Sequence, residues 1–209
     1  MPVFHADNFN RYCDKLASRD KTFQKIITAF GYPPLWTRPN TYASLIHIIL
    51  EQQVSLASAK AAFVKLKNHI GVITPQKLLK LSDAELKICY FSRQKIIYSR
   101  QLAEAIVSKQ LQLKQLELLP EEDIRTPLKM IKGIGDWTVD IYLLFVLQRC
   151  DIFPTGDLAM MNALKQVKQL PKQTSKEAII ELAECWRPYR SIATYLLWHH
   201  YIKSRSILV

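Results

Sequence analysis

Two glycines, Gly133 and Gly135, stand one residue apart within residues 131–138. They are two of only five glycines in 209 residues, and helix-like stretches lie on both sides of them. Glycine adopts backbone angles that other residues avoid, and it lets another backbone approach closely. A Gly-x-Gly step at the opening of a helix leaves N–H groups pointing outward, where they can hold an anion. The pattern therefore predicts a tight hairpin between two helices that can bind phosphate.

The rest of the chain also reads as helix. Residues 40–53 carry apolar side chains at helical spacing, and no convincing run alternates between apolar and polar residues as a half-buried strand would. Several other segments begin with residues that typically cap helices or open a capping box. These residues are Asp20, Ser55, Thr74, Ser82, Ser92 and Thr174. We therefore expect an all-α fold of roughly ten helices.

Two irregular stretches divide this helical pattern, and the first of them is rich in proline. They are residues 32–39 and 150–156. We expect residues 40–149 to form a central helical lobe, with a helix-hairpin-helix motif at about residues 124–147. Residues 1–39 and 150–209 are expected to pair into a second lobe that is built from both chain ends.

The charge balance favours a polyanionic partner. The chain has 29 lysines and arginines against 18 acids, which gives a net charge of +11. Such an excess points first to nucleic acid and second to an acidic membrane surface. The longest apolar run, residues 141–147, is far shorter than the roughly 20 residues of a membrane-spanning helix. The first residues do not read as a secretory signal, so we expect no membrane partner.

Metal and disulfide chemistry is not expected. The four cysteines lie too far apart in sequence for a zinc knuckle or an iron–sulfur loop, and the five histidines show no useful ligand spacing. Free thiols are typical of a reducing cytosol, so we expect a cytoplasmic protein.

Asp157 ends the run Thr155-Gly156-Asp157, just before another apolar helix-like stretch. An aspartate at such a place commonly caps the helix that follows. It can also supply a fixed negative charge to a reacting centre, and the two roles are compatible. A phosphate-binding hairpin followed by an acid indicates chemistry on a nucleic acid.

Together with two flanking stretches, the hairpin and Asp157 resemble the helix-hairpin-helix/Gly-Pro-Asp DNA glycosylase superfamily, and most of all its 3-methyladenine DNA glycosylase II group. One flank is residues 48–55, and the other is residues 186–191 with residues 196–198. The motifs occur in family order along most of the chain. The resemblance implies two helical lobes with a cleft between them. It also implies that a damaged nucleotide is turned out of double-stranded DNA and that its base is then released.

The resemblance further implies roles for single residues. Asp157 falls on the catalytic aspartate at the cleft, and Gln53 falls where a side chain wedges into the gap left by the flipped base. Trp137 and Trp198 fall on aromatic positions of the base pocket, and Ile141 falls on a further pocket position. Each assignment has a plainer alternative, because tryptophans in helices mostly belong to the core and Gln53 is also an ordinary polar residue at a helix end.

The hairpin is expected to hold the DNA backbone without reading its sequence. Its residues are Lys132, Gly133, Ile134, Gly135 and Thr138. The family often holds a monovalent cation, sodium or potassium, at the hairpin carbonyls, and no other cofactor or metal is implied. An ordinary glycine-containing turn is the alternative. Five further basic residues either extend the binding surface or are solvated charges, namely Arg93, Lys95, Arg100, Lys165 and Lys168.

Position 137 separates two kinds of glycosylase. Superfamily members that also cut the DNA strand carry a lysine there, whereas this chain has Trp137. No Schiff base can form without that amine, so no lyase step is expected. The cysteine cluster of the endonuclease-like branch and the N-terminal β-rich lobe of the enterobacterial enzyme have no counterpart either.

These residues fit the hydrolysis of an N-glycosidic bond. Cleavage builds positive charge on the sugar, which an ionised Asp157 can stabilise while it orients the attacking water. Alkylated purines such as 3-methyladenine and 7-methylguanine are themselves cationic, which suits electron-rich aromatic faces. We therefore expect a monofunctional DNA glycosylase of base excision repair, monomeric, of bacterial type and associated with the nucleoid when bound to DNA. A non-catalytic helix-hairpin-helix DNA-binding or damage-sensing module is the alternative.

Overall fold

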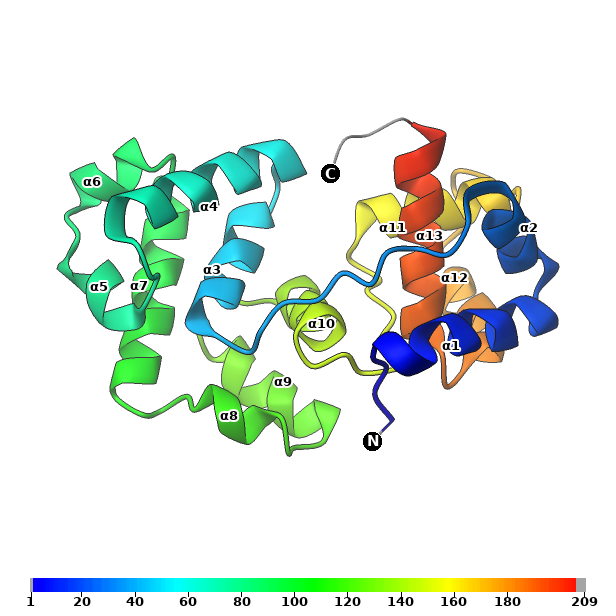
Figure 1. The fold of residues 1–209 in the computed structure, drawn as a ribbon, viewed down its shortest axis with the longest axis horizontal. Coiled ribbons are helices and arrows are strands. Elements are labelled where there is room, and N and C mark those ends of the chain that lie inside the picture. Colours follow the sequence, from blue (N-terminus) through cyan, green and yellow to red (C-terminus); the bar gives the residue numbers. More distant parts are fainter. Residues whose placement is uncertain (1, 206–209) are drawn as a thin grey trace. The chain divides into compact units, whose positions relative to one another are not determined.

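The computed structural model describes residues 2–205, and this range is built from α-helices, labelled α1 to α13 in Figure 1. A bridge between Val3 and Arg149 is the only β pairing within it. The prediction of an all-α fold is therefore confirmed, although several short helices raise the number above the one expected. In the same range, no helix is both long enough and apolar enough to cross a membrane.

Residues 38–142 form one compact unit, termed the central unit. Its first helices are α3 (Tyr42–Glu51), α4 (Leu56–Ile70), α5 (Pro75–Lys80), α6 (Asp83–Ile88) and α7 (Arg93–Val107). They are followed by α8 (Leu113–Leu116), α9 (Glu121–Lys129) and most of α10 (Asp136–Phe145). The unit is organised around α3, which packs against α4 and α7 and buries seven of its ten residues.

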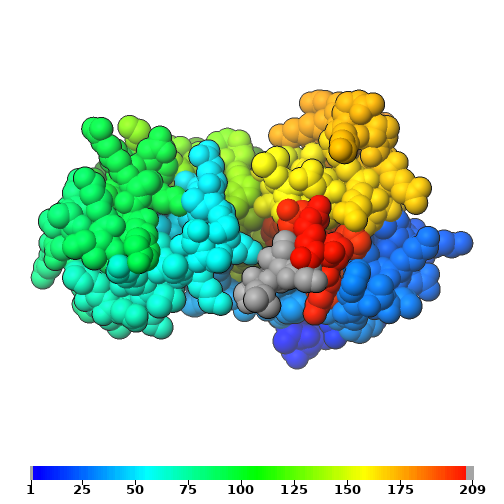
Figure 2. All heavy atoms as spheres, turned by 90° about the horizontal axis from the view of Figure 1, so that it is seen from above, coloured from blue at the N-terminus to red at the C-terminus, as the bar shows by residue number. Residues whose placement is uncertain are grey.

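Residues 2–37 and 143–205 form the other compact unit, termed the terminal unit. It contains α1 (Ala6–Arg19), α2 (Lys21–Phe30), α11 (Leu158–Val167), α12 (Lys176–Ala183), the 3₁₀ turn Glu184–Trp186 and α13 (Arg190–Ser204). Residues 191–199 of α13 are all buried, as expected of a helix that is surrounded by others. Figure 2 shows the end of α13 (red) between α11 (yellow) and α2 (blue), both of which α13 contacts.

The division between the two units falls inside a helix. The sequence placed the boundary after residue 149, whereas the compact units divide after Tyr142, within α10. The last turn of α10 belongs to the aromatic core of the terminal unit. There, the Phe145 ring centroid lies 5.9 Å from that of Tyr195 and 5.4 Å from that of Trp198. Residue composition marked the irregular linker but could not reveal this packing.

Local capping explains where most of the helices begin. Five of the six predicted capping residues accept a hydrogen bond from a backbone N–H in the first turn of their helix, namely Asp20, Ser55, Thr74, Ser82 and Ser92. The sixth prediction was wrong by one residue. Ser175 caps α12, whereas the Thr174 hydroxyl donates to the Pro171 carbonyl at 2.7 Å.

Candidate functional site

The glycine hairpin joins α9 to α10 in the central unit. The Ile134 N–H donates to the Ile131 carbonyl at 3.0 Å, which closes the turn. The Val139 N–H donates to the Gly135 carbonyl at 3.1 Å, which begins the hydrogen-bond ladder of α10. The turn therefore delivers the chain directly into a helix N-terminus, the kind of backbone arrangement that attracts anions.

Only one of the two glycines is required by its surroundings. Gly133 has a φ of +88°, and a Cβ there would lie 2.1 Å from the ring of Tyr98 on α7. Both the backbone angle and the ring therefore exclude a side chain. At Gly135, by contrast, an added Cβ would meet no atom within 4 Å. Gly135 leaves open space at the start of α10.

Gln52, the last residue before the predicted wedge, binds the hairpin. Its Nε2 donates to the Gly133 carbonyl at 2.8 Å and to the Thr138 hydroxyl oxygen at 2.9 Å. The role of Gln52 could not be predicted from the sequence, because two adjacent glutamines at a helix end carry the same signal. Its neighbour Gln53 is exposed and has a φ of +55°. The Gln52 side chain is therefore bound to the hairpin, whereas the Gln53 side chain is exposed to solvent.

The predicted backbone-binding residues differ in what they present to solvent. Lys132 is exposed, whereas Ile134 and Thr138 are 4% and 2% exposed. Any contact of the last two with DNA would therefore use their main chain. Whether these residues bind phosphate stays a prediction.

Two ion pairs join α9 to α10 behind the hairpin. Lys129 Nζ lies 2.7 Å from Asp136 Oδ1, and Arg125 Nη2 lies 2.7 Å from Asp140 Oδ1. Lys129, Asp136 and Arg125 border an open groove of about 640 Å³, whose lining also includes Glu122. Because the lining mixes both signs of charge, the groove does not favour a polyanion.

Trp137 and Ile141 lie one turn apart on α10. Trp137 is half-buried, and Ile141 is 2% exposed. Ile141 is therefore a core residue of the central unit, and any contribution to a base pocket would come from the edge of its side chain. The pocket roles of both residues stay predictions.

Asp157 lies in the terminal unit and caps α11. Its Oδ1 accepts a hydrogen bond from the Met160 N–H at 2.8 Å and another from the Trp198 indole Nε1 at 3.0 Å. Its own N–H donates to the Pro154 carbonyl at 2.9 Å. The capping role considered for this residue is therefore real, and the carboxylate is also held by a side chain from α13. It remains half-buried rather than enclosed.

Trp198 makes a contact that its sequence position did not reveal. The side chain is 8% exposed, and its ring packs against those of Phe145 and Tyr195, with centroid distances of 5.4 and 6.0 Å. Its N–H points to Asp157. Of the predicted site residues, Asp157 and Trp198 are thus directly joined within one compact unit.

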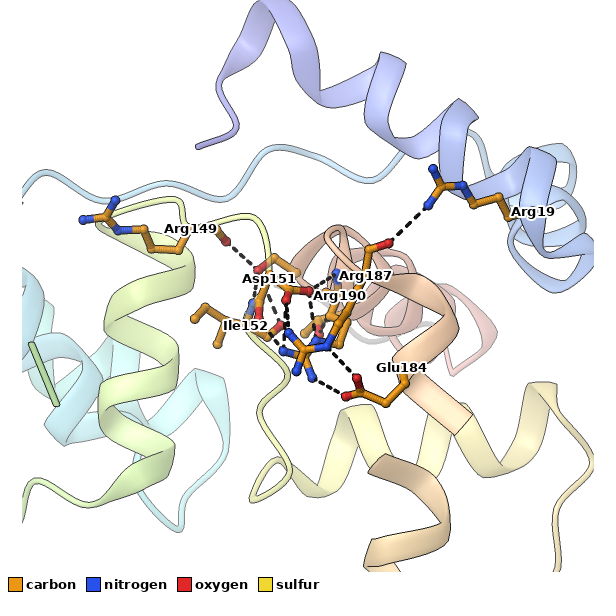
Figure 3. Close-up of polar contacts among 9 residues, drawn as sticks. Arg19, Arg149, Asp151, Ile152, Glu184, Arg187 and Arg190 are labelled. Atoms are coloured by element: carbon orange, nitrogen blue, oxygen red, sulfur yellow. Dashed lines mark hydrogen bonds and ion pairs between the residues drawn. The ribbon is translucent and has the colours of Figure 1, made fainter. Parts of the chain in front are cut away.

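A second cluster fixes the chain segment that leads to Asp157. Arg190 at the start of α13 donates to both carboxylate oxygens of Asp151, at 2.9 and 3.0 Å, and to Glu184 at 3.0 Å (Figure 3). Arg187 pairs with the same two acids. The Ser191 hydroxyl accepts the N–H of Ile152 at 2.8 Å. The start of α13 and residues 151–152 are therefore bound together.

Most of the basic residues proposed to extend the binding surface have structural partners. Lys95 donates to the Leu50 carbonyl at 2.6 Å, and burial lowers the pKa of its ammonium group. Arg100 donates to the Leu81 carbonyl and to Asp83. Lys165 and Lys168 behave likewise, with bonds to the Lys172 carbonyl and to Asp20. These side chains thus already have partners within the fold, and a role for them in DNA binding stays a prediction.

Among residues 2–205, no three histidine, cysteine or acidic side chains are grouped so that they could hold a metal ion. All four cysteines are free thiols, three of them buried. The groups available for chemistry are the carboxylate of Asp157, the aromatic side chains of Trp137 and Trp198, and the N-terminus of α10.

Comparison with known proteins places this arrangement among DNA repair proteins. Residues 46–188 match the HhH-GPD superfamily, described as base excision DNA repair proteins. The chain is 30% identical over 190 residues to DNA-3-methyladenine glycosylase 1 of Schizosaccharomyces pombe, covering 88% of this chain and 83% of that protein. It is 28% identical over 198 residues to the alkylbase DNA glycosidase-like protein mag2 of the same organism, covering 91% and 93%.

Solved structures agree with the sequence comparison. The 3-methyladenine DNA glycosylase of S. pombe in complex with abasic DNA superposes with a TM-score of 0.82 at 28% identity, covering 90% of this chain and 95% of that one. A DNA-3-methyladenine glycosidase from Bacillus halodurans gives a TM-score of 0.79 at 28% identity, covering 99% and 95%.

Proposed function

The chain belongs to the HhH-GPD superfamily of base excision DNA repair proteins, and from this premise we propose that it is a monofunctional DNA glycosylase for alkylated purines. Its relatives are named as DNA-3-methyladenine glycosylases and an alkylbase glycosidase-like protein. The proposed reaction is hydrolysis of the N-glycosidic bond of 3-methyladenine- or 7-methylguanine-type bases after the nucleotide is flipped out of the duplex.

The observation that carries this proposal is the fixed carboxylate of Asp157. Its Oδ1 is held by the first turn of α11 and by the Trp198 indole. A carboxylate held in this way needs little reorganisation when positive charge develops on a nearby sugar, which is how preorganised groups lower a barrier. The same group can orient the water that captures the sugar cation.

The residues present suit the release of a cationic base without strand cleavage. Position 137 carries a tryptophan, which cannot form the Schiff base that a lyase step requires. A cationic alkylated purine is already a good leaving group, so the site needs no strong general acid. The aromatic face of Trp137 can attract such a base by a cation–π contact worth about 0.5–2 kcal/mol.

The hairpin is proposed to bind the DNA backbone, and Gln53 is proposed to insert into the base stack. The N-terminus of α10 offers main-chain donors to phosphate, which positions the backbone without reading sequence. Gln53, exposed at a left-handed position just beyond the C-cap of α3, is proposed to fill the gap in the base stack. The complex of a structural relative with abasic DNA supports DNA as the partner.

The proposal includes a monovalent cation at the hairpin carbonyls. The carbonyls of Ile131 and Gly133 each accept one hydrogen bond already, and a carbonyl oxygen has two lone pairs. The main chain therefore still offers oxygen ligands, but no step of the reaction described above depends on an ion there.

The decisive experiment measures base release under single-turnover conditions. Duplexes carrying 3-methyladenine, 7-methylguanine, ethenoadenine or hypoxanthine would be incubated with excess protein. We expect free base and an intact abasic strand from the first two, with no covalent adduct after borohydride treatment. Binding without any base release would instead favour the non-catalytic DNA-binding or damage-sensing module. A trapped adduct would show that the enzyme is a glycosylase/lyase.

A further inference from the structure

Gln52 contacts both sides of the hairpin with one amide group. The Gly133 carbonyl lies in the turn, and the Thr138 hydroxyl lies in the first turn of α10. A glutamine amide nitrogen has two hydrogens, and the two bonds use both of them. The end of α3 is thereby fastened to the turn and to the helix that the turn opens.

The same two elements are also held by α7. The Tyr98 ring occupies the space where a side chain at Gly133 would stand. One turn earlier on α7, Lys95 donates to the Leu50 carbonyl near the end of α3 at 2.6 Å. The C-terminal end of α3, the hairpin and α7 therefore form a closed set of contacts within the central unit. Figure 1 shows α3 between α7 and α10.

The residue that follows Gln52 gives this arrangement a functional consequence. Gln53 is exposed with a φ of +55°, and Ser55 then caps α4. Consecutive Cα atoms are about 3.8 Å apart, so fixing the Gln52 amide on the hairpin also limits where Gln53 can stand. The two adjacent glutamines thus have different tasks, because the amide of Gln52 is already bound inside the protein.

We propose that Gln52 is a positioning residue that couples the wedge to the hairpin, so that Gln53 enters the DNA only at a set distance from the phosphates gripped at the start of α10. This inference rests on the proposed DNA-binding function. It adds that binding of the DNA backbone by the hairpin and insertion of Gln53 into the base stack are coupled. Loss of the Gln52 amide uncouples them without removing either part.

A double-mutant cycle tests this coupling in the full-length protein. Gln52→Met keeps the length of the side chain and removes both donors, Gln53→Ala removes the wedge, and the double variant combines the changes. Binding is measured by fluorescence anisotropy with an abasic duplex, on which no base is released. Gln76→Met, an exposed glutamine on α5, is the matched control.

The expected result is strong non-additivity. Gln53→Ala weakens binding about tenfold in the native background and has little further effect in Gln52→Met, as contacts that share one network behave. Gln76→Met leaves affinity unchanged. If the two losses simply multiply, or if Gln53→Ala has no effect in the native protein, the coupling does not exist. A purely structural role for Gln52 also predicts multiplication.

Two further measurements keep the outcome clear. If Gln52→Met binds too weakly for the cycle, Thr138→Val removes only one of the two acceptors, and the cycle is repeated with that variant. Thermal unfolding confirms that each variant is folded. Base release by the native protein tests the proposed function separately, so a failed coupling and a failed enzyme assignment give different results.

Discussion

The indole N–H of Trp198 donates to Oδ1 of Asp157 at 3.0 Å, and the same oxygen accepts the N–H of Met160 at 2.8 Å. The carboxylate is therefore oriented by a side chain from the most buried helix of the terminal unit and by the backbone of α11. Two donors on one oxygen define the direction of the group, which is the property that electrostatic stabilisation of a transition state needs.

Asp157→Asn should abolish most base release while it leaves DNA binding intact. The amide keeps the size of the side chain and still caps α11, because asparagine is as good an N-cap as aspartate. It loses the negative charge under the sugar, so we expect single-turnover release to fall by about 10²–10³-fold or more, by analogy with other single stabilising groups. Near-normal release in this variant would refute the catalytic assignment.

Trp198→Phe should slow release without weakening DNA binding. The change keeps an aromatic ring against Phe145, removes the donor to Asp157 and reduces the volume of the side chain. We expect kcat to fall about tenfold, since a hydrogen bond to a charged group is at stake, with KM nearly unchanged. Trp186→Phe is the matched control, because its Nε1 donates to Asp20 at 2.9 Å. The control should lower the melting temperature and spare kcat. Equal effects of the two changes on kcat would count against a positioning role for Trp198.

Gly133→Ala and Gly135→Ala should differ sharply. Alanine at 133 meets the Tyr98 ring and must adopt a positive φ, which alone costs about 1–2 kcal/mol. We expect a lower melting temperature and about tenfold weaker binding of an abasic duplex. Alanine at 135 has open space around its Cβ and should unfold like the native protein. Thermal unfolding of the two variants side by side is the measurement, and matching curves would disprove the tight contact.

DNA binding should depend steeply on salt, and Lys132 should carry part of that dependence. Each phosphate contact releases counterions, so affinity falls linearly with salt on a logarithmic scale. Lys132 is the exposed cation of the hairpin. Lys132→Ala should reduce the slope by about one phosphate contact and weaken binding equally for all sequences. An unchanged slope in a titration of 50–300 mM salt would mean that Lys132 is only solvated.

Asp20 should stabilise the fold at neutral pH but not in acid. Burial raises the pKa of this carboxyl, but the bonds from Lys168, the Thr22 backbone and Trp186 outweigh it, so its pKa in the folded state is lowered. A lowered folded-state pKa contributes stability above the unfolded value of about 3.9, and that contribution is lost as pH falls through the folded value. Asp20→Asn should therefore unfold more easily than the native protein at pH 7, and the difference should shrink below about pH 4. A difference that is constant across this range would exclude an ionic origin.

Residues whose roles are local could be read from the sequence. Asp20, Ser55 and Ser82 cap helices because a short polar side chain reaches its own backbone, and the sequence contains everything that this requires. Gly133 marks the hairpin for the same reason, since a positive φ is a property of the residue and its neighbours. For Thr174 and Ser175 the local sequence is not enough, because either of the two adjacent hydroxyls could cap α12.

Residues whose roles depend on distant partners could not be read in this way. Gln52 and Gln53 are chemically the same, and only the hairpin, far along the chain, distinguishes them. Arg100 carries the same charge as a DNA-binding arginine, but its partners are two carbonyls at the C-terminal end of α5 and the Asp83 carboxylate. The Trp198–Asp157 hydrogen bond joins α13 to the start of α11, and the sequence of neither segment indicates that the other is its partner. Motif order indicated the superfamily, whereas long-range geometry determined what each side chain contacts.

The contact between Tyr98 and Gly133 makes two distant positions evolutionarily interdependent. The ring fills the volume that an absent methyl group leaves free, so a relative with a larger residue at 133 would need a smaller one at 98 in addition to a strained positive φ. Such a paired exchange would leave a correlated signature across orthologues. It would also give protein engineers a compensating substitution for the steric part of any change at that glycine.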